Sequence, residues 1–451
     1  MRFRLYQYGI LLLMLFVLAL PAYAKISPKK AQAPAARTYT LKQAVLRALD
    51  ANPSIEAKIK MLEAARMNVG VAQSYFWPRI SLVASTNRLQ NYEEVQTYNS
   101  DNLSSDNWSK GIRAQLNLFA GFAHLNNLQK SRLSVQVEEA RHRQARLELA
   151  CNVQLQFLQL LRLRQELKSA QDSVVRLKTQ LQSIESYAAV DMAPYVNVLQ
   201  TKTDLAKAEQ QVIRCKNDLR NTHVQLNKYL NLPPEAPIKY VGKLEEFAAT
   251  VGYTEENAVK TAVKNRPDLI IAQRSIDIAY KDMHITMGRF LPRVDATYDN
   301  ISQSKDYDDE RNYEGYTRRY WATGLQFSWE FFSGGETTFQ TLSDRKRAQS
   351  LRKDFEDAMN NAQAEVIRSL LDIQAAKELI TASKLGVTAA RESYAMARTR
   401  YDTQTGTITE LLDAQVRLTQ AEDDASRALA DFQSARARFF YYIGRENAGL
   451  I

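Results

Sequence analysis

The sequence predicts a mainly α-helical fold with a β-barrel part, and three observations predict it. The chain of 451 residues carries two copies of one unit, long stretches without glycine or proline, and two short segments per copy in which apolar and polar residues alternate. Uninterrupted stretches of helix-forming residues predict long helices, and an alternation of period two predicts strands with one apolar face. The low totals of 15 Gly and 11 Pro agree with few turns and long elements.

The two copies lie in almost gapless register. A shift of 214 or 213 residues superposes the first copy on the second, and the matched positions are Ala44, Ala48, Pro53, Pro78, Arg79, Trp108, Gly111, Phe119 and Gly121 with Ala258, Ala262, Pro267, Pro292, Arg293, Trp321, Gly324, Phe332 and Gly334. A duplicated unit of about 190 residues indicates a fold that needs both copies. We assign 41–231 to the first copy, 232–254 to a linker, 255–444 to the second copy and 445–451 to a tail.

Residues 1–24 predict an export signal. Arg2 and Arg4 precede an apolar run from Ile10 to Leu20, and an A-x-A sequence ends at Ala24. The alternative is an uncleaved membrane anchor, but the run is about half as long as the roughly 20 residues that a spanning helix needs. We therefore expect export and removal of this segment, followed by an N-terminal linker over 25–40.

Composition excludes several classes of protein. The net charge of +10 is scattered, without the basic block that nucleic-acid binding favours. The sequence contains none of the common nucleophile, zinc-protease or phosphate-loop motifs, so neither an enzyme nor a bound cofactor is expected. His124, His142, His223 and His284 lack metal-ligand spacing and are predicted to lie on helix surfaces, with no metal site.

The two cysteines are predicted to be packed residues and not a disulfide. In a helical hairpin that turns near residue 191, Cys151 lies about 24 Å along the helix from the position opposite Cys215. A disulfide needs Cα atoms within about 7 Å of each other.

Each copy begins with two short helices. The first starts at Leu41 and is interrupted at Asn52, because the residue before a proline is driven out of the helical region. The second is predicted over about Ser54 to Tyr75, with Ser54 as the N-cap. It ends before Pro78, where the period changes from 3.6 to 2.

Strands are predicted over about 79–119 and 292–332, each range holding two strands and a polar loop. Apolar residues alternate with polar ones in both ranges; the apolar set is Ile80, Leu82, Ala84, Ile112, Ala114, Leu116, Leu118, Leu325, Phe327, Trp329 and Phe331. Helical hairpins follow over about 121–231 and 335–444, with turns near Pro194 and Gly406. A helix of about 65 residues is about 100 Å long.

Four strands per chain cannot close a barrel, since about eight are the practical minimum. A sheet in a membrane must still pair every strand edge. Three identical chains would pool twelve strands around a water-filled lumen, and the paired helices would continue the wall away from the membrane. The sequence therefore predicts a homotrimer with a 12-stranded barrel and an α-helical coiled-coil tunnel.

The same residues resemble the TolC family of outer-membrane channels over nearly the whole chain. The resemblance rests on the ordered, duplicated set Leu41, Ala44, Ala48-Leu49, Asn52-Pro53, Asn265 to Asp268, Pro78, Pro292, Phe119-Ala120-Gly121, Phe332-Ser333-Gly334, Val198-Leu199-Gln200 and Leu411 to Gln415. It implies a channel in the outer membrane with a periplasmic helical tunnel. This channel would be the exit duct of a tripartite efflux pump or a type I secretion system, served by a periplasmic adaptor and an ABC or RND inner-membrane transporter. The alternative is a soluble periplasmic coiled-coil adaptor or structural tether, which would carry a single hairpin.

The resemblance assigns adaptor docking to the hairpin tips. Their residues are Asp191, Met192, Ala193 and Pro194 in the first copy and Gln404, Thr405 and Gly406 in the second. Members of the family usually carry a glycine where this chain has Asp191 and Gln404.

The resemblance also places a gate beyond the second tip. Glu410 and Asp413 lie three residues apart on one helix face, so that a trimer would gather six carboxylates able to attract divalent cations. The alternative is that they only complement the positive end of a helix. Tyr401 matches an aromatic residue of the family's closed gate, but its charged partners fall on Asn197 and Gly406, which cannot form the same links.

Five aromatic residues near the strands are candidates for belts at the membrane interface: Trp108, Trp321, Trp329, Tyr298 and Tyr320. Ordinary packing within the sheet is the alternative.

Overall fold

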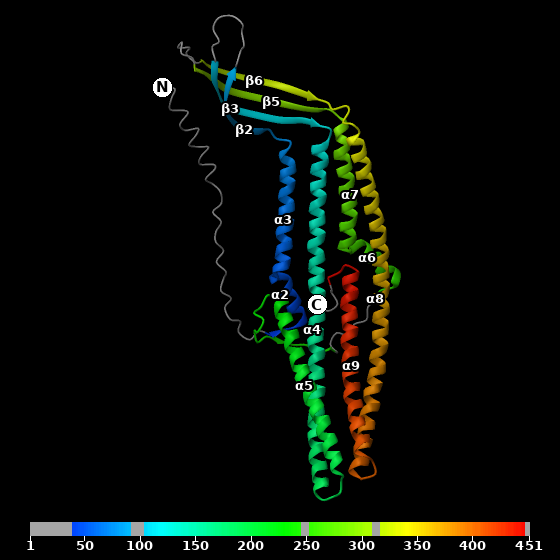
Figure 1. Ribbon diagram of the computed structural model, residues 1–451. Coiled ribbons are helices and arrows are strands. Elements are labelled where there is room, and N and C mark those ends of the chain that lie inside the picture. Colours follow the sequence, from blue (N-terminus) through cyan, green and yellow to red (C-terminus); the bar gives the residue numbers. More distant parts are fainter. Residues whose placement is uncertain (1–37, 92–102, 245–251, 309–315, 447–451) are drawn as a thin grey trace, which may run out of the picture. The chain divides into compact units, whose positions relative to one another are not determined.

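The computed structural model describes residues 38–91, 103–244, 252–308 and 316–446. The predicted signal peptide, most of the N-terminal linker, part of the 232–254 linker and most of the C-terminal tail lie outside the described residues. The elements of the first half are β1 (Thr38–Tyr39), α2 (Leu41–Ala51), α3 (Pro53–Ser74), β2 (Arg79–Asn91), β3 (Leu103–Ala120), α4 (Ala123–Ala189) and α5 (Tyr195–Tyr229) (Figure 1).

The second half has the same order of elements. These are β4 (Lys239–Tyr240), α6 (Glu255–Asn265), α7 (Pro267–Met287), the 3₁₀ turn η2 (Gly288–Phe290), β5 (Arg293–Asp308), β6 (Tyr316–Ser328), α8 (Glu336–Asp402) and α9 (Ile408–Tyr442). Helices α4 and α8 each contain 67 residues, and α5 and α9 each contain 35. The predicted mainly α-helical fold with a small β part is confirmed.

Prolines fix the starts of the shorter helices. Asn52 adopts an extended backbone before Pro53, ends α2, and accepts a hydrogen bond from the backbone N–H of Ser54 through its side chain. The prediction that Ser54 caps α3 was therefore wrong. A residue forced out of the helical region by a following proline already has the backbone of an N-cap, and Pro53 needs no N–H at the first helical position.

One antiparallel sheet joins the two halves, with strand order β2-β3-β5-β6. Strands β3 and β5 pair from Ser104 with Asp308 to Ala120 with Arg293, with a bulge between Asn117 and Phe119. The two short strands β1 and β4 form a separate parallel pair. The sheet lies at the end of the helices from which α4 begins, and the hairpin turns lie at the opposite end (Figure 1).

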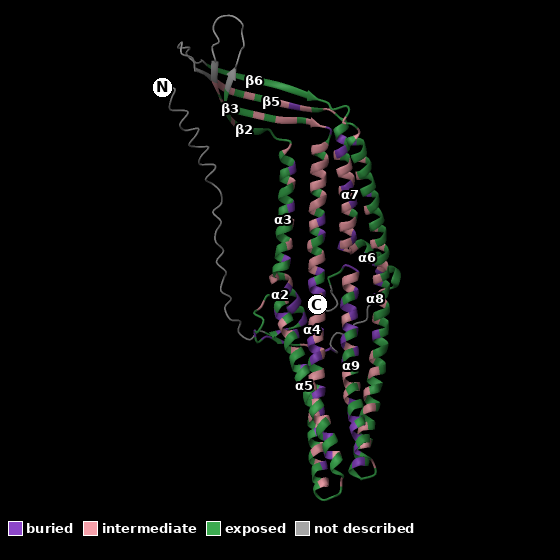
Figure 2. Ribbon diagram, in the orientation of Figure 1, coloured by how far each residue is buried: buried purple, intermediate pink, exposed green. Residues whose placement is uncertain are grey.

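The helices pack in pairs around α4. Helix α4 packs against α2, α3 and α5 of its own half and against α7 and α9 of the other half. Figure 2 shows most buried residues on α4 and α9, whereas α3 and α8 are mainly exposed. No described helix is both long and apolar enough to cross a bilayer.

The largest core cluster lies where α4 and α5 meet the β1–β4 pair, and its most deeply buried α4 residues are Val153, Phe157, Leu158 and Leu160. Beside this cluster, the side chain of Asn227 holds the segment that follows α5 by hydrogen bonds. The side-chain nitrogen of Asn227 lies 3.0 to 3.2 Å from the carbonyl oxygens of Pro233, Pro234 and Ala236. The side-chain oxygen of Asn227 accepts a hydrogen bond from the Tyr240 hydroxyl at 2.6 Å. Burial raises the pKa of Tyr240 far above its ordinary range, so the phenol stays protonated and donates.

Cys151 and Cys215 are buried and free, which confirms the prediction that they form no disulfide. The prediction that the histidines lie on helix surfaces fits His284, which is exposed, whereas His124, His142 and His223 are half-buried. His223 contacts the backbone oxygen of Ile238 at 2.7 Å and packs on Tyr240, because the segment after α5 folds back over it. His124 stacks on Tyr75 with ring centroids 5.2 Å apart, and burial lowers its pKa.

Candidate functional site

The hairpin tips end both 67-residue helices in the same way. After α4, Met192 N–H bonds to Tyr187 O and Asp191 N–H bonds to Ala188 O, while Asp191 takes a φ of 55°. After α8, Thr405 N–H bonds to Arg400 O, and Gln404 takes a φ of 61°. This is the Schellman motif, whose left-handed position favours glycine. The predicted tips thus form tight turns, and a non-glycine residue holds the strained position in each.

Replacing Gln404 by glycine is expected to stabilise the second tip by about 0.5–1 kcal/mol, because glycine removes the steric cost of positive φ. Asp191→Gly should stabilise the first tip by less, since aspartate tolerates a positive φ better than glutamine does. Hydrogen exchange of the Thr405 amide would report the gain as slower exchange. Gln404→Ala is the matched control, because alanine keeps the strain. Equal protection in both variants would contradict the strain at this position.

The predicted gate carboxylates lie on the first turns of α9. Glu410 is at the third helical position, where its N–H bonds to the Thr407 hydroxyl, and its carboxylate lies 3.7 Å from the Arg400 guanidinium. Asp413 is exposed one turn later. In a single protomer, therefore, the negative charge of Glu410 complements the positive end of α9, and its carboxylate also faces the guanidinium of Arg400.

Arg400 was not singled out by the sequence. Its guanidinium contacts Glu410 and the Thr405 carbonyl oxygen, and it crosses the turn at Gly406, where an added Cβ would lie 3.0 Å from the Arg400 Cβ. A basic residue in the last turn of a helix is common enough to carry no signal alone. Only the structure of the turn shows that Gly406, which has no side chain, leaves space for the side chain of Arg400.

Tyr401 is buried in a cluster within the protomer, together with Leu177, Ile184, Val198 and Leu411. This cluster joins the two hairpins just above their tips. Burial raises the pKa of Tyr401, with smaller contributions from Tyr187 and Asp402. Asn197, by contrast, is half-buried in the first turn of α5. Tyr401 is thus buried inside the protomer, whereas Glu410 and Asp413 are exposed.

The predicted belt residues fall on two faces of the sheet. Trp108, Tyr298 and Trp321 belong to the face that also carries Ile80, Leu82, Ile112, Leu325 and Phe327, since directly paired residues share a face. Tyr320 pairs with Ile301 and lies on the opposite face with Arg113 and Asp299, which form an ion pair at 2.7 Å. Neighbouring residues of a strand point to opposite sides, so Tyr320 and Trp321 cannot both face lipid.

Trp329 lies just beyond the end of β6. Its ring nitrogen donates to the backbone oxygen of Phe290 at 3.0 Å, and its ring packs edge-on to Phe331. Trp321 and Trp329 are eight residues apart, which corresponds to about 26 Å of extended chain. With the tilt of about 40° that barrel strands adopt, this corresponds to roughly 20 Å of height, close to the apolar band of outer-membrane barrels.

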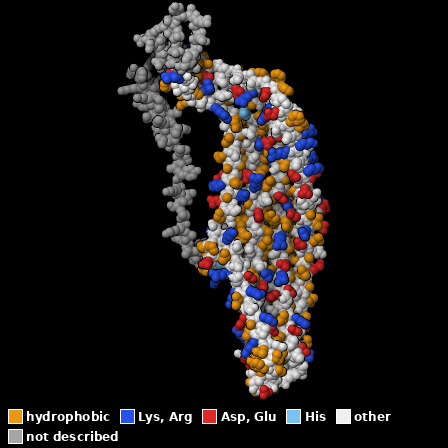
Figure 3. Space-filling model, in the orientation of Figure 1, with side chains coloured by type: hydrophobic (Ala, Val, Ile, Leu, Met, Phe, Trp, Pro, Cys, Tyr) orange, Lys and Arg blue, Asp and Glu red, His pale blue; other side chains and the backbone are white. Residues whose placement is uncertain are grey.

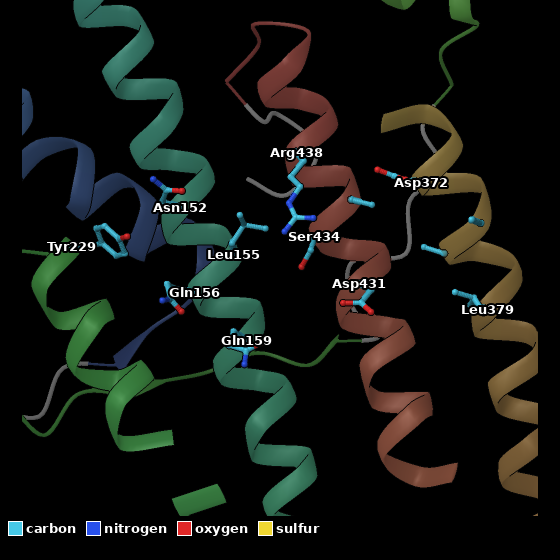
Figure 4. A pocket seen from close by; sticks show the side chains of 13 residues that line it. Asn152, Leu155, Gln156, Gln159, Tyr229, Asp372, Leu379, Asp431, Ser434 and Arg438 are labelled. Carbon is cyan, nitrogen blue, oxygen red and sulfur yellow. The ribbon is translucent and has the colours of Figure 1, made fainter. Parts of the chain in front are cut away.

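A polar groove lies among α4, α5, α8 and α9, with a volume of about 670 Å³ (Figure 4). Its walls include Asn152, Gln156, Asp372, Asp431 and Arg438. Among the described residues, no group of three or more histidine, cysteine or acidic side chains could hold a metal ion. On the face shown in Figure 3, acidic and basic side chains are interspersed along the helices.

A family model described as "Outer membrane efflux protein" matches residues 44–232 and matches again at 258–445. The chain belongs to this family. Outer membrane efflux proteins are channels and not enzymes, in agreement with the prediction of no catalytic activity. Membership confirms the resemblance and the location in the outer membrane, with a periplasmic helical part.

Among curated relatives of this outer membrane efflux protein, the alkaline protease secretion protein AprF of Pseudomonas aeruginosa is 23% identical over 88% of this chain and 82% of that protein. The outer membrane protein TolC of Vibrio cholerae is 22% identical over 84% of this chain and 85% of that protein. The solved structure of the Campylobacter jejuni CmeC outer membrane channel has a TM-score of 0.78 at 15% identity and covers 90% of this chain and 85% of that one. This last likeness shows the fold.

Proposed function

We propose that the protein is the exit duct of a tripartite efflux pump or a type I secretion system, working as a homotrimer. The observation that carries this proposal is the four-stranded sheet with one apolar face, one polar face and two open edges. An open sheet cannot lie in hydrocarbon, whereas twelve pooled strands close a barrel with the polar face toward water. The name of AprF favours secretion, and the family description favours efflux.

The barrel would be anchored by aromatic residues at two heights. Trp108 and Trp321 are placed farther from the helices on the apolar face and Trp329 at the end near the helices, whereas Tyr298, which pairs with Thr323, lies between these two levels. Aromatic rings with one polar atom favour the boundary between lipid and water. Tyr320 is assigned to the lumen instead.

Proteins of this family act with adaptors and inner-membrane transporters. We place adaptor docking at the tips, whose chemistry differs between the hairpins. The first tip exposes Val190, Met192, Tyr195 and Val196. The second tip is rich in hydroxyl groups, including those of Thr403 and Thr405. An adaptor with apolar side chains at its own tip would therefore bind at the first hairpin. Which adaptor binds decides whether the inner-membrane partner is of the ABC or the RND type.

We place a carboxylate ring at the mouth. Glu410→Ala combined with Asp413→Ala is expected to weaken the block of conductance by divalent cations, because the cation would lose the oxygen ligands of the six carboxylates in a trimer. Planar-bilayer recording with increasing Mg²⁺ would measure the block. Arg400→Ala is a useful companion variant, since it frees Glu410 from its cation and should strengthen the block. If the wild-type protein, the double variant and Arg400→Ala were all blocked equally by Mg²⁺, that result would contradict the carboxylate ring.

The proposed function is tested by fractionation and conductance of the full chain. The duct should partition with the outer membrane, require detergent, behave as a trimer in detergent, and form conducting pores in planar bilayers. Crosslinking in cells should recover an adaptor and an inner-membrane transporter, whose type then decides between efflux and secretion. Release with the soluble periplasm, together with a lack of conductance, would favour the tether instead.

A further inference from the structure

A second pocket, of about 410 Å³, lies where α4 and α5 meet the segment 233–238 that follows α5. Helix α4 contributes Leu160 and Arg164 to its walls, and α4 and α5 run side by side (Figure 1). The volume is within the range of pockets that hold small molecules. Lys216, on the α5 wall, is 21 residues from Tyr195 at the start of that helix, or about 32 Å along it. The pocket is therefore separate from the hairpin tips.

The α5 wall of the pocket is a stripe along one face of the helix. Lys216, Arg220 and Val224 follow each other at intervals of four residues. Leu219 and His223 lie beside them at the three-residue spacing, and both spacings place residues on the same side of a helix. The stripe therefore sets two cations beside apolar side chains.

Arg164 adds a third cation from α4. Its Nη1 atom donates to the backbone oxygen of Tyr240, which is its one hydrogen bond with the described residues. Burial lowers the pKa of Arg164, and no described carboxylate offsets this effect. Because a guanidinium does not lose its proton in proteins, the side chain is a partly buried cation without a counter-ion among the described residues. Such a cation favours an anion in the pocket beside it.

The wall opposite the stripe is mainly apolar and firmly held. It consists of Pro234, Ala236 and Pro237, apart from the carboxylate of Glu235. The side chain of Asn227 holds the carbonyl oxygens of Pro234 and Ala236. Since proline also fixes its own φ angle, this wall is in place before a ligand arrives. A pocket that is already formed has little conformational entropy to lose on binding.

Glu235 supplies the negative charge in the pocket lining. Its carboxylate lies 3.3 Å from the Arg220 guanidinium, but the Arg220 and Glu235 side chains are 75% and 83% exposed. An ion pair this exposed is weak, so an anion that also contacts Lys216 can take its place. Lys216 itself forms no ion pair with a described residue. Cations thus outnumber carboxylates here, in contrast to the mixed charges along the helices in Figure 3.

The second copy of the repeat has different residues at the corresponding place. At the shift of 213 residues, Lys216 corresponds to Leu429 and Arg220 to Gln433. Gln433 is packed in the interior and is 1% exposed. The two cations are therefore a feature of α5 alone and do not follow from the duplication.

We propose that this pocket binds a small organic anion, whose charged group is a carboxylate or a phosphate and whose body is apolar. The charged group contacts Arg164, Lys216 and Arg220, through the charge-assisted hydrogen bonds that guanidinium and ammonium groups form with such anions. The apolar body packs against Leu219 and Pro237. A bound anion joins α4, α5 and the segment after α5, and so stabilises that segment. This inference goes beyond the proposed duct, because the site needs neither the barrel nor the tips.

Calorimetric titration of the full chain in a non-ionic detergent tests the site. The probes are benzoate and phenyl phosphate, since each joins one anionic group to a compact apolar ring, and the wild-type protein should bind at least one of them. The double variant Lys216→Gln with Arg220→Gln should lower the affinity for the better probe at least about tenfold, because hydrogen bonds to charged groups are lost. It should also abolish the rise in thermal midpoint that this probe causes in the wild-type protein.

The matched control is Arg214→Gln with Lys228→Gln. It also removes two positive charges from exposed positions of α5, but neither residue lines the pocket, so the affinity should stay unchanged. Glu235→Gln should raise the affinity by about two- to fivefold, because a competing carboxylate is removed. Inorganic phosphate lacks the apolar body and benzyl alcohol lacks the charge, so both should bind more weakly than the probes.

A loss of affinity confined to the Lys216 and Arg220 variant supports the site, and the better probe identifies the preferred charged group. Equal affinity in this variant and its control, whether lowered or unchanged, would overturn the site. Failure of the wild-type protein to bind either probe would overturn it as well. Inorganic phosphate that binds as tightly as phenyl phosphate, or benzyl alcohol that binds as tightly as benzoate, would overturn the proposed class of ligand. None of these measurements uses conductance, so the proposed duct is tested separately.

Discussion

Gly121→Ala is expected to destabilise the fold by roughly 2–5 kcal/mol, the sum of a strained left-handed backbone and of overpacking against a neighbour that cannot move. Gly121 has a φ of 59°, and its missing side chain leaves room for the backbone of Gly288, whose carbonyl oxygen would lie 2.0 Å from an added Cβ. This contact fixes the junction of β3 and α4 against the end of α7. The thermal midpoint of the purified protein in detergent should fall by many degrees.

The control for this variant is Gly70→Ala. Gly70 lies inside α3, where an added Cβ meets no described atom within 4 Å. Alanine is the better helix former, so Gly70→Ala should stabilise by about 1 kcal/mol. If both variants shifted the midpoint equally, the close approach of Gly121 and Gly288 would not be the cause.

Asn227→Ala is expected to cost about 3–5 kcal/mol, because several buried polar groups lose their partner at once. The Asn227 side chain is fully buried; it holds the carbonyl oxygens of the segment after α5 and accepts from the Tyr240 hydroxyl. Without it, this segment should leave its place on the core cluster. Faster hydrogen exchange of the Ile238 and Val241 amides would report the change, together with a lower thermal midpoint.

Tyr240→Phe is the matched control for that variant. It removes only the hydroxyl and keeps the ring that packs on Phe157, so a loss of about 1 kcal/mol is expected. Hydrogen exchange of the Ile238 amide should remain slow in Tyr240→Phe. A loss in Tyr240→Phe as large as in Asn227→Ala would assign the effect to the phenol and not to the carboxamide.

Much of the fold is predictable from the sequence, because its strongest signals are periodic. Prolines 53, 78, 267 and 292 punctuate the short helices, and the absence of breakers after Gly121 predicts the 67-residue helix. The period of two predicts the strands and their apolar face. Strand ends are harder to predict: β6 stops at Ser328 because its pairing partner ends there, and not because its own sequence changes.

The candidate site was less predictable, because contacts between distant residues decide it. The tip turns were placed from breakers, but their left-handed residues Asp191 and Gln404 are not glycines, so propensity alone would not have found them. Arg400 contacts Glu410 only because the turn at Gly406 brings two helices together. Tyr320 and Trp321 have similar side chains, and only their pairing assigns them to opposite faces.

The two 67-residue helices differ in stiffness. Helix α4 contains no glycine or proline along its length, so it acts as an unbroken rod between the sheet and its tip. Helix α8 carries Gly386, exposed and free of close neighbours among the described atoms, about 24 Å before its last residue. Bending near the tips is therefore expected in the last turns of α8, while α4 stays straight and serves as the fixed strut against which they move.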